Sequence, residues 1–171
     1  MRISLFGLGY VGCVTAASLA RDGHEVVGVD VSAEKVAMIE AAVPPVVEEG
    51  LGELLEKVVT AGRLSATTSA GWAVAATEMA MICVGTPGGR TGQIDLGAVE
   101  RVGREIGEGL RERPGSYTVV LRSTVLPGTT ERVLAPAIAA GIGGARGPEL
   151  RFAVNPEFMR EGTSLKDFTR P

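Results

Sequence analysis

Short apolar runs recur along the chain and are separated by longer segments with helical spacing. Each run is bounded by glycine or by polar residues, which is typical of strands buried in a sheet. The runs that predict strands are residues 2–6, 24–30, 63–69, 79–85, 117–123 and 151–155, and 63–69 is the more polar of them.

The segments between these runs carry apolar residues at intervals of three and four. Val99, Val102, Ile106 and Leu110, for example, fall on one face of a helix. The same reasoning predicts helices over 10–23, 33–42, 50–62 and 95–110, a short one around Trp72, and one in the later part of 126–141.

The alternation of strands and helices predicts an α/β fold. We expect a Rossmann-type, doubly wound, mostly parallel six-stranded sheet with helices on both faces. The composition, 45% hydrophobic and 22% charged, is that of an ordinary globular protein. The length suits a single domain over residues 1–171.

Charge and composition exclude several classes of function. A net charge of −3, from 17 basic and 20 acidic residues, gives no electrostatic case for nucleic acid or an anionic membrane as partner. No apolar run reaches the roughly 18 residues of a membrane helix, and the early glycines do not suit a signal peptide. With two cysteines, the chain is expected to be cytoplasmic, without a disulfide framework or a metal site.

The stretch FGLGYVG at residues 6–12 is the strongest local signal of chemistry. It follows a predicted strand, opens a predicted helix, and precedes an acid, Asp30, that closes the next strand 18 residues past Gly12. Gly7 allows a sharp turn, Gly9 leaves room for a pyrophosphate, and Gly12 allows close helix packing. Backbone N–H groups at the helix start then face the phosphates. The alternative is a glycine-rich turn that binds no dinucleotide.

Asp30 favours NAD over NADP as the cofactor. Its carboxylate can accept hydrogen bonds from both ribose hydroxyls of the adenosine. A 2′-phosphate would instead face a like charge, and two unit charges about 4 Å apart repel by roughly 4 kcal/mol at an effective dielectric near 20.

Five segments, taken together and in order, resemble one enzyme family. They are MRISLFGLGYVG, GHEVVGVDVS, ICVGTP, RSTVLPGT and NPEFMREGTSLKDF. They resemble the UDP-glucose/GDP-mannose dehydrogenases, NAD-dependent enzymes that oxidise C6 of a nucleotide sugar from alcohol to acid. RSTVLPGT and GRLSATTS are more similar to the branch that acts on GDP-mannose. A UDP-glucose or UDP-N-acetylsugar enzyme and a non-catalytic NAD-binding module remain alternatives.

The resemblance implies that this chain is the NAD-binding domain of such an enzyme. The family's long central helix and the C-terminal domain that completes the nucleotide-sugar site are not matched by these residues. The resemblance also implies that the full-length form is a homo-oligomer.

The resemblance further implies roles for individual residues. Those at the NAD site are Gly7, Gly9, Tyr10, Val11, Gly12, Asp30, Lys35, Thr86 and Thr124. Thr124 also belongs to the catalytic site, Glu157 is the general base that activates water, and Glu161 contacts the sugar. The alternatives are structural roles without a function in the site: core packing for Val11, a solvent-exposed side chain for Lys35, a turn residue for Thr86 and a charged helix surface for the two glutamates. Pro156 suits a helix start, and a spacing of four would put Glu157 and Glu161 on one helix face.

The family mechanism uses a cysteine thiolate that passes through a thiohemiacetal and a thioester. The family places that cysteine in a region that this chain does not match. Cys13 and Cys83 lie in a predicted helix and a predicted apolar strand, so we expect both to be structural. The chain alone is therefore expected to bind NAD without turnover. One departure from the family pattern is Glu49, which stands where relatives commonly have proline.

Overall fold

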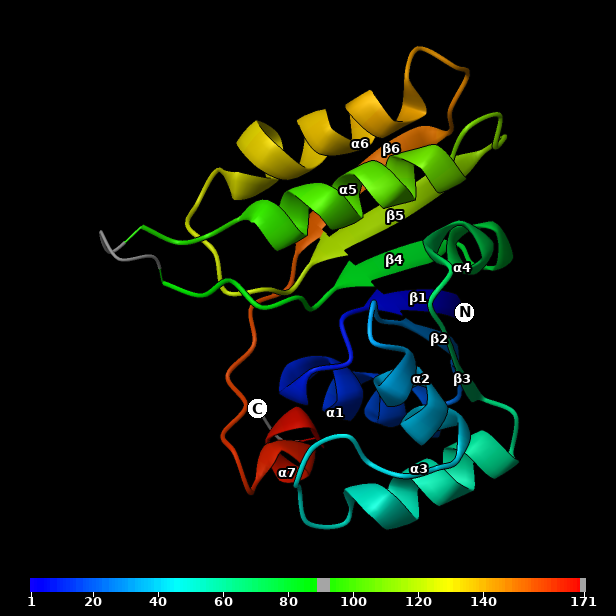
Figure 1. Cartoon of the computed structure of the whole chain (residues 1–171), viewed down its shortest axis with the longest axis vertical. Coiled ribbons are helices and arrows are strands. Elements are labelled where there is room, and N and C mark those ends of the chain that lie inside the picture. Colours follow the sequence, from blue (N-terminus) through cyan, green and yellow to red (C-terminus); the bar gives the residue numbers. More distant parts are fainter. Residues whose placement is uncertain (89–92, 170–171) are drawn as a thin grey trace.

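A six-stranded, fully parallel sheet forms the centre of the molecule. The structure, a computed structural model, describes residues 1–88 and 93–169. The strands are β1 (Arg2–Phe6), β2 (Glu25–Val29), β3 (Leu64–Thr67), β4 (Met79–Ile82), β5 (Ser116–Leu121) and β6 (Glu149–Val154). Their order across the sheet is β3-β2-β1-β4-β5-β6, with every pair parallel (Figure 1). The doubly wound six-stranded sheet predicted from the sequence is confirmed, and it is parallel throughout.

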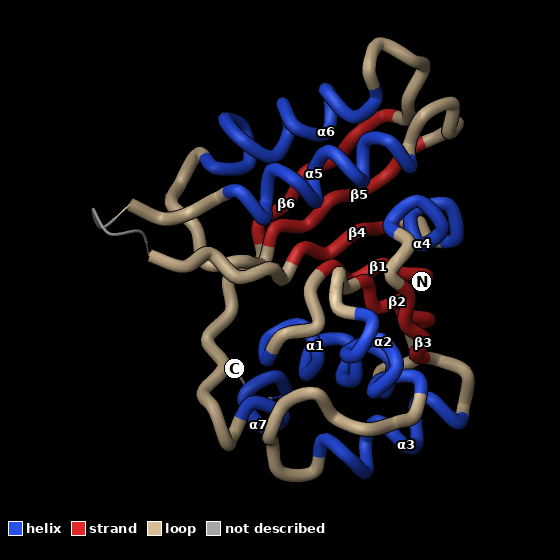
Figure 2. The backbone as a smooth tube through the Cα atoms, in the orientation of Figure 1, coloured by secondary structure: helices blue, strands red, loops and turns tan. Residues whose placement is uncertain are grey.

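Helices cover both faces of the sheet, as predicted. They are α1 (Tyr10–Arg21), α2 (Ala33–Glu40), α3 (Leu51–Thr60), α4 (Ala70–Ala76), α5 (Gly97–Gly109), α6 (Ala135–Ile142) and α7 (Ser164–Thr169), with a π-helical turn, η1, over Thr130–Leu134. Figure 2 shows α4, α5 and α6 on one side of the strands and α1, α2, α3 and α7 on the other. None of the helices within residues 1–88 and 93–169 is both long and apolar enough to cross a membrane.

Two apolar cores lie on opposite faces of the sheet. Leu5 of β1 packs with Val14 of α1 and Leu55 of α3, whereas its neighbour Phe6 packs with Val99 and Ile106 of α5. Successive strand residues point to opposite faces, so a central strand covered on both sides must be apolar throughout. This explains why β1 reads as a continuous apolar run. The edge strand β6 is largely exposed.

The chain reverses its direction across the sheet between β1 and β4. After β1 the connection enters α1 on one face, and after β4 it leads to α5 on the other face. The carboxyl ends of these two neighbouring strands therefore border a crevice, where ligands bind in open parallel sheets.

The helix predicted after Pro156 is wrong. Residues 155–160 have no regular structure, 161–163 form a turn, and α7 begins only at Ser164. Glu157 and Glu161 therefore do not share a helix face. The segment has to pass from β6 to the side of α1 (Figure 1). Extended backbone covers about 3.3 Å per residue against 1.5 Å in a helix, and this favours the extended form.

Candidate functional site

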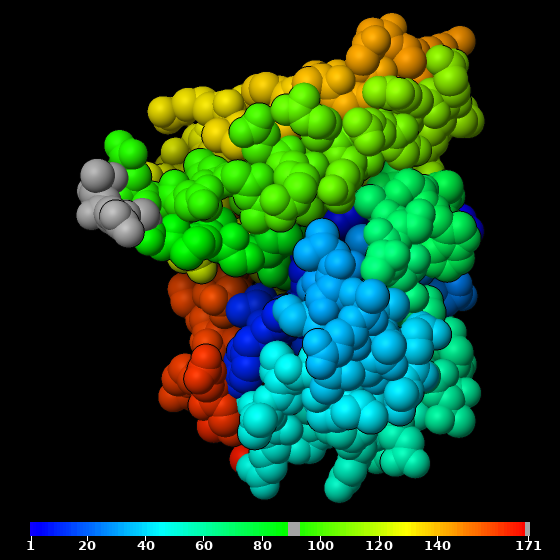
Figure 3. All heavy atoms as spheres, viewed as in Figure 1, coloured from blue at the N-terminus to red at the C-terminus, as the bar shows by residue number. Residues whose placement is uncertain are grey.

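A cavity of about 550 Å³ opens at the carboxyl ends of β1, β2 and β4. Its wall includes Gly7, Gly9, Asp30 and Lys35 on one side and residues of α5 on the other. Figure 3 shows the surface hollowed between the green region that contains α5 and the blue regions of α1 and α2. Four of the nine predicted cofactor residues thus line one cavity.

The three glycines of the β1–α1 turn differ in what surrounds them. Gly7 has a φ of +97°, and a Cβ there would lie 2.8 Å from the carbonyl oxygen of Cys83. A Cβ on Gly12 would lie 1.7 Å from the carbonyl oxygen of Gly7, so α1 packs against the turn itself. Around a Cβ at Gly9, no heavy atom of the described residues lies within 4 Å. Of the three glycines, only Gly9 has free space around an added Cβ, and Gly9 lines the cavity.

Asp30 is held firmly at the edge of this cavity. Its Oδ2 accepts a hydrogen bond from the Leu8 N–H at 2.7 Å, and its Oδ1 accepts one from the Ser32 N–H at 2.9 Å. Lys35 Nζ lies 3.7 Å from Oδ2. A carboxylate offers about four lone-pair positions, so two remain for further donors. The aspartate thus braces the glycine turn and can still accept hydrogen bonds from a ligand.

A second cavity, of about 210 Å³, adjoins the first. Thr86 Oγ1 donates a 2.6 Å hydrogen bond to the Thr124 carbonyl, which joins the loops after β4 and β5. The predicted residues that line this second cavity are Gly9, Tyr10, Val11, Thr86, Thr124 and Glu157. Gly9, Cys83, Val84 and Gly85 line both cavities, so the two lie side by side, and we call this pair of adjoining cavities the trough.

Two predicted residues stand apart from the walls of this trough. Gly12 is buried behind the turn, where its role is packing. Glu161 is exposed and is not among the described residues that line either cavity. Glu157, in contrast, reaches the second cavity, and its Oε2 accepts a 2.9 Å hydrogen bond from the Met159 N–H.

The sequence reasoning missed Arg122, which is only 9% exposed and lines the second cavity. Its Nη1 donates to Asn155 Oδ1, and its guanidinium carbon lies 5.8 Å from the centre of the Phe168 ring. Its Nε has no hydrogen-bond partner among the described residues. The signal available was its position directly before Ser123 and Thr124 in RSTVLPGT.

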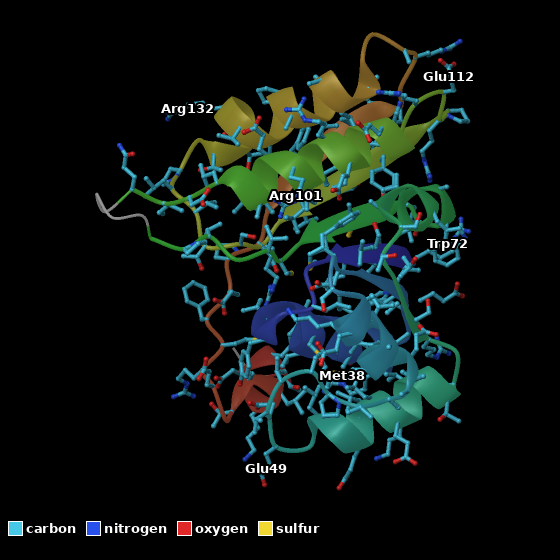
Figure 4. The ribbon with its side chains drawn as sticks, viewed as in Figure 1. Met38, Glu49, Trp72, Arg101, Glu112 and Arg132 are labelled. Atoms are coloured by element: carbon cyan, nitrogen blue, oxygen red, sulfur yellow. The ribbon has the colours of Figure 1, made fainter. Side chains whose placement is uncertain are left out.

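Two residues of α5 were also missed. Arg101 and Glu105 line the first cavity opposite Asp30, and Figure 4 labels Arg101 on the helix. Burial raises the pKa of Glu105, while the charge of Arg101 opposes that rise. Their spacing of four places them on one helix face, but the apolar stripe of α5 gave no reason to assign its polar residues to a site.

Both cysteines are buried, and this decides their reactivity. Burial raises the pKa of Cys13 to about 12 against the opposing charge of Lys35, and that of Cys83 to about 12 against the opposing charge of Arg122. At pH 8 the thiolate fraction is then about one in ten thousand.

We expect a thiol reagent such as Ellman's to label the native chain at least ~100-fold more slowly than the urea-unfolded chain. Rapid labelling of one thiol in the native chain would show that this thiol is activated.

The trough has the features that a dinucleotide requires. Its centre is the start of α1, a 12-residue helix whose first turn contains no acidic residue of its own and lines the second cavity with Tyr10 and Val11, so the positive helix end lies at the trough. The open space at Gly9 is the kind of cradle that a Cβ would fill, and Asp30 supplies acceptors at one end. The residues present therefore fit a dinucleotide cofactor.

Comparison with known proteins agrees with this geometry. A GDP-mannose 6-dehydrogenase from Azotobacter vinelandii is 52% identical over 171 residues, which is 100% of this chain and 39% of that protein. A GDP-mannose dehydrogenase from Pseudomonas aeruginosa, solved as a ternary complex, is 49% identical with a TM-score of 0.95, covering 100% of this chain and 39% of that one. A UDP-glucose dehydrogenase structure from Pyrobaculum islandicum is 45% identical with a TM-score of 0.93, covering 99% and 39%.

The chain thus spans well under half the length of these relatives. The model of the "UDP-glucose/GDP-mannose dehydrogenase family, NAD binding domain" matches residues 1–171. The chain therefore belongs to the UDP-glucose/GDP-mannose dehydrogenase family, of which it is the NAD-binding domain.

Proposed function

We propose that this chain is the cofactor domain of a nucleotide-sugar 6-dehydrogenase that oxidises GDP-mannose, and that residues 1–171 act as one domain. The observation that carries the proposal is the trough, the pair of adjoining cavities. It runs from Asp30 and Lys35 at one end, past the start of α1, to Thr124 and Glu157 at the other. A dinucleotide laid along it would have its adenosine at the first end and its reactive ring at the second.

We assign tasks to the predicted cofactor residues that line the trough as follows. Asp30 accepts from the ribose hydroxyls, and Lys35 stands beside it. The backbone N–H groups of Tyr10 and Val11, at the positive start of α1, face the phosphates, with Gly9 leaving room for them. Thr86 and Thr124, joined by their hydrogen bond, border the reactive end. NAD, when bound, supplies the hydride acceptor.

Glu157 and Thr124 are the residues of this chain that we assign to catalysis. Both border the second cavity, where the Thr124 hydroxyl can hold a water or the substrate oxygen. Glu157 can take a proton from that water as general base. We assign Glu161 to the sugar, outside the trough. Because Cys13 and Cys83 are buried with high pKa values, we propose that the nucleophilic thiol comes from a segment beyond the residues matched here.

The choice of GDP-mannose is supported by the relatives. The two GDP-mannose dehydrogenases are 52% and 49% identical to this chain, against 45% for the UDP-glucose dehydrogenase. This difference in sequence identity is small, and the segment that reads the base is not matched by this chain. UDP-glucose stays the alternative substrate. Assembly into a homo-oligomer and a cytoplasmic location are part of the same proposal.

Titration with NAD and NADP tests the cofactor site without requiring turnover. We expect NAD to bind roughly tenfold to a hundredfold more tightly than NADP, less than an isolated carboxylate would give, because Lys35 offsets part of the repulsion. Asp30→Ala should weaken NAD binding and reduce the preference for NAD over NADP. Asp22→Ala, which changes an exposed aspartate at the far end of α1, should change neither the affinity nor the preference. Equal binding of both dinucleotides to the unaltered chain would contradict the assignment of Asp30.

A further inference from the structure

The last described segment of the chain folds into a small hook over residues 157–169. Asp167 closes it by accepting hydrogen bonds from the Arg160 N–H at 3.0 Å, from Arg160 Nη2 at 2.8 Å and from Thr163 Oγ1 at 3.1 Å. Met159 and Leu165 pack their side chains against the core beneath α1. The hook thus has its own internal closure and carries Glu157 and Glu161.

One buried carboxylate fastens this hook to the rest of the molecule. Glu48, 9% exposed, lies in the loop before α3. Its Oε2 accepts a 2.8 Å hydrogen bond from the Gly162 N–H, and its Oε1 accepts a 3.4 Å bond from the Leu165 N–H. Burial would raise the pKa of Glu48, but hydrogen bonds from Tyr10, Gly162 and Leu165 outweigh it and keep the pKa below its usual value. The carboxylate is therefore held in its charged form.

The same carboxylate also binds the dinucleotide turn. Tyr10, the first residue of α1, donates its hydroxyl to Glu48 Oε2. That hydroxyl accepts the Gly162 N–H at 3.0 Å and lies 2.8 Å from Ser164 Oγ, whose residue is fully buried. Three segments far apart in the sequence thus meet at one point. One of them carries the backbone N–H groups that we assign to the phosphates.

We propose that Glu48 is a positioning residue that couples cofactor binding to the placement of the hook. This inference rests on the proposed function, because it takes the trough as the NAD site and Glu157 and Glu161 as acting residues. A dinucleotide that orders the start of α1 also orders the Tyr10 hydroxyl, and through Glu48 it holds Gly162, the neighbour of Glu161. By thermodynamic linkage, an ordered hook must improve cofactor affinity by the same factor.

The chemistry of the network explains why a carboxylate is needed. The N–H groups of Gly162 and Leu165 approach opposite oxygens of Glu48, while the Tyr10 hydroxyl donates to one of them. Glutamine would present one oxygen and one NH₂ group, which leaves one donor facing another donor. Even the isosteric change should therefore open the attachment. Glu49, the adjacent exposed glutamate that Figure 4 shows at the outside of the molecule, provides a matched control.

Amide hydrogen exchange on the chain without cofactor tests the attachment itself. In Glu48→Gln we expect the amides of Gly162 and Leu165 to exchange roughly tenfold to a hundredfold faster, because one of them then faces the glutamine NH₂ group and the other keeps only a neutral oxygen as acceptor. Tyr10→Phe, a milder change, should accelerate Gly162 but not Leu165. Glu49→Gln should leave both unchanged. The amides of β4 and β5 monitor global folding. Unchanged exchange at both Gly162 and Leu165 in a folded Glu48→Gln chain would overturn the attachment.

Adding NAD tests the coupling separately. In the unaltered chain we expect NAD to slow exchange at Gly162 and Leu165, and in Glu48→Gln we expect this protection to vanish and NAD affinity to fall by up to about tenfold. A purely structural role would leave the NAD-dependent protection in place. If NAD binds the unaltered chain without protecting Gly162, the coupling is wrong while the cofactor site stands. If NAD does not bind at all, the proposed function fails, and with it the coupling.

Discussion

A Gly12→Ala chain is expected to lose about 4 kcal/mol or more of its free energy of unfolding. The added Cβ would lie 1.7 Å from the carbonyl oxygen of Gly7 and 3.2 Å from the Leu5 side chain. Neither the turn nor α1 can yield alone, because α1 is packed on the sheet and Gly7 already lies against Cys83. Domains of this size have a free energy of unfolding of only about 5–15 kcal/mol, so the substitution removes much of the stability of the chain. Urea unfolding followed by circular dichroism measures the loss.

The control for this substitution is Gly71→Ala in α4. A Cβ there meets no heavy atom of the described residues within 4 Å, and the residue is helical. Alanine in a helix is favoured over glycine by up to about 1 kcal/mol, so Gly71→Ala should leave stability unchanged or slightly raised. A Gly12→Ala chain as stable as the Gly71→Ala chain would contradict the close packing of α1 on its own turn.

The fold was accessible from the sequence because its signals are local. The central strands are apolar on both faces, and the helices between them carry their apolar residues at regular intervals, as Val99, Val102 and Ile106 show in α5. Alternation then left little choice but a doubly wound sheet. The bounds were less accurate: β4 and β5 end at Ile82 and Leu121, three residues or more before Thr86 and Thr124. The loops that carry these threonines begin earlier than hydropathy indicates.

The site was accessible only as far as single segments reveal it. The glycine turn and Asp30 follow from their own spacing, and the structure places both on one cavity. Glu48 could not be found in this way, because its significance depends on a contact with Gly162, 114 residues away. Arg122 stands in the segment RSTVLPGT, but its contact with Asn155, 33 residues away, appears only in the folded chain. The role of a buried charged side chain depends on its partners, and only the folded chain brings these partners together.

The error after Pro156 has the same origin. Pro156 and the spacing of Glu157 and Glu161 are compatible with a helix, and nothing local opposes one. The direction of the segment is set instead by where it is anchored, at Asn155 beside β5 and at Gly162 beside Tyr10. The distance between two anchors is a property of the fold, and it overrides local preference here.

The complementary substitution, Gly9→Ala, is expected to abolish cofactor binding while leaving the fold intact. Gly9 has a φ of −76° and a ψ of −168°, an extended conformation that alanine adopts without strain, and its Cβ would project into open space. Because a dinucleotide in the trough would place its phosphates against this position, the methyl group and the phosphates would compete for the same volume. We expect NAD affinity to fall at least ~100-fold in calorimetric titration, with a stability change within about 1 kcal/mol.

The pair of glycine substitutions separates two explanations of the motif. If FGLGYVG only makes a tight turn, Gly9 should tolerate alanine in every assay, and Gly12 alone should matter. If the motif binds a pyrophosphate, Gly12→Ala should reduce the stability of the fold, and Gly9→Ala should weaken NAD binding. These two defects should be independent of each other. Gly71→Ala, outside the lining of both cavities, should bind NAD like the unaltered chain. A Gly9→Ala chain that binds NAD as tightly as the Gly71→Ala control would remove the phosphates from the start of α1, because no other position in the turn leaves a cradle open.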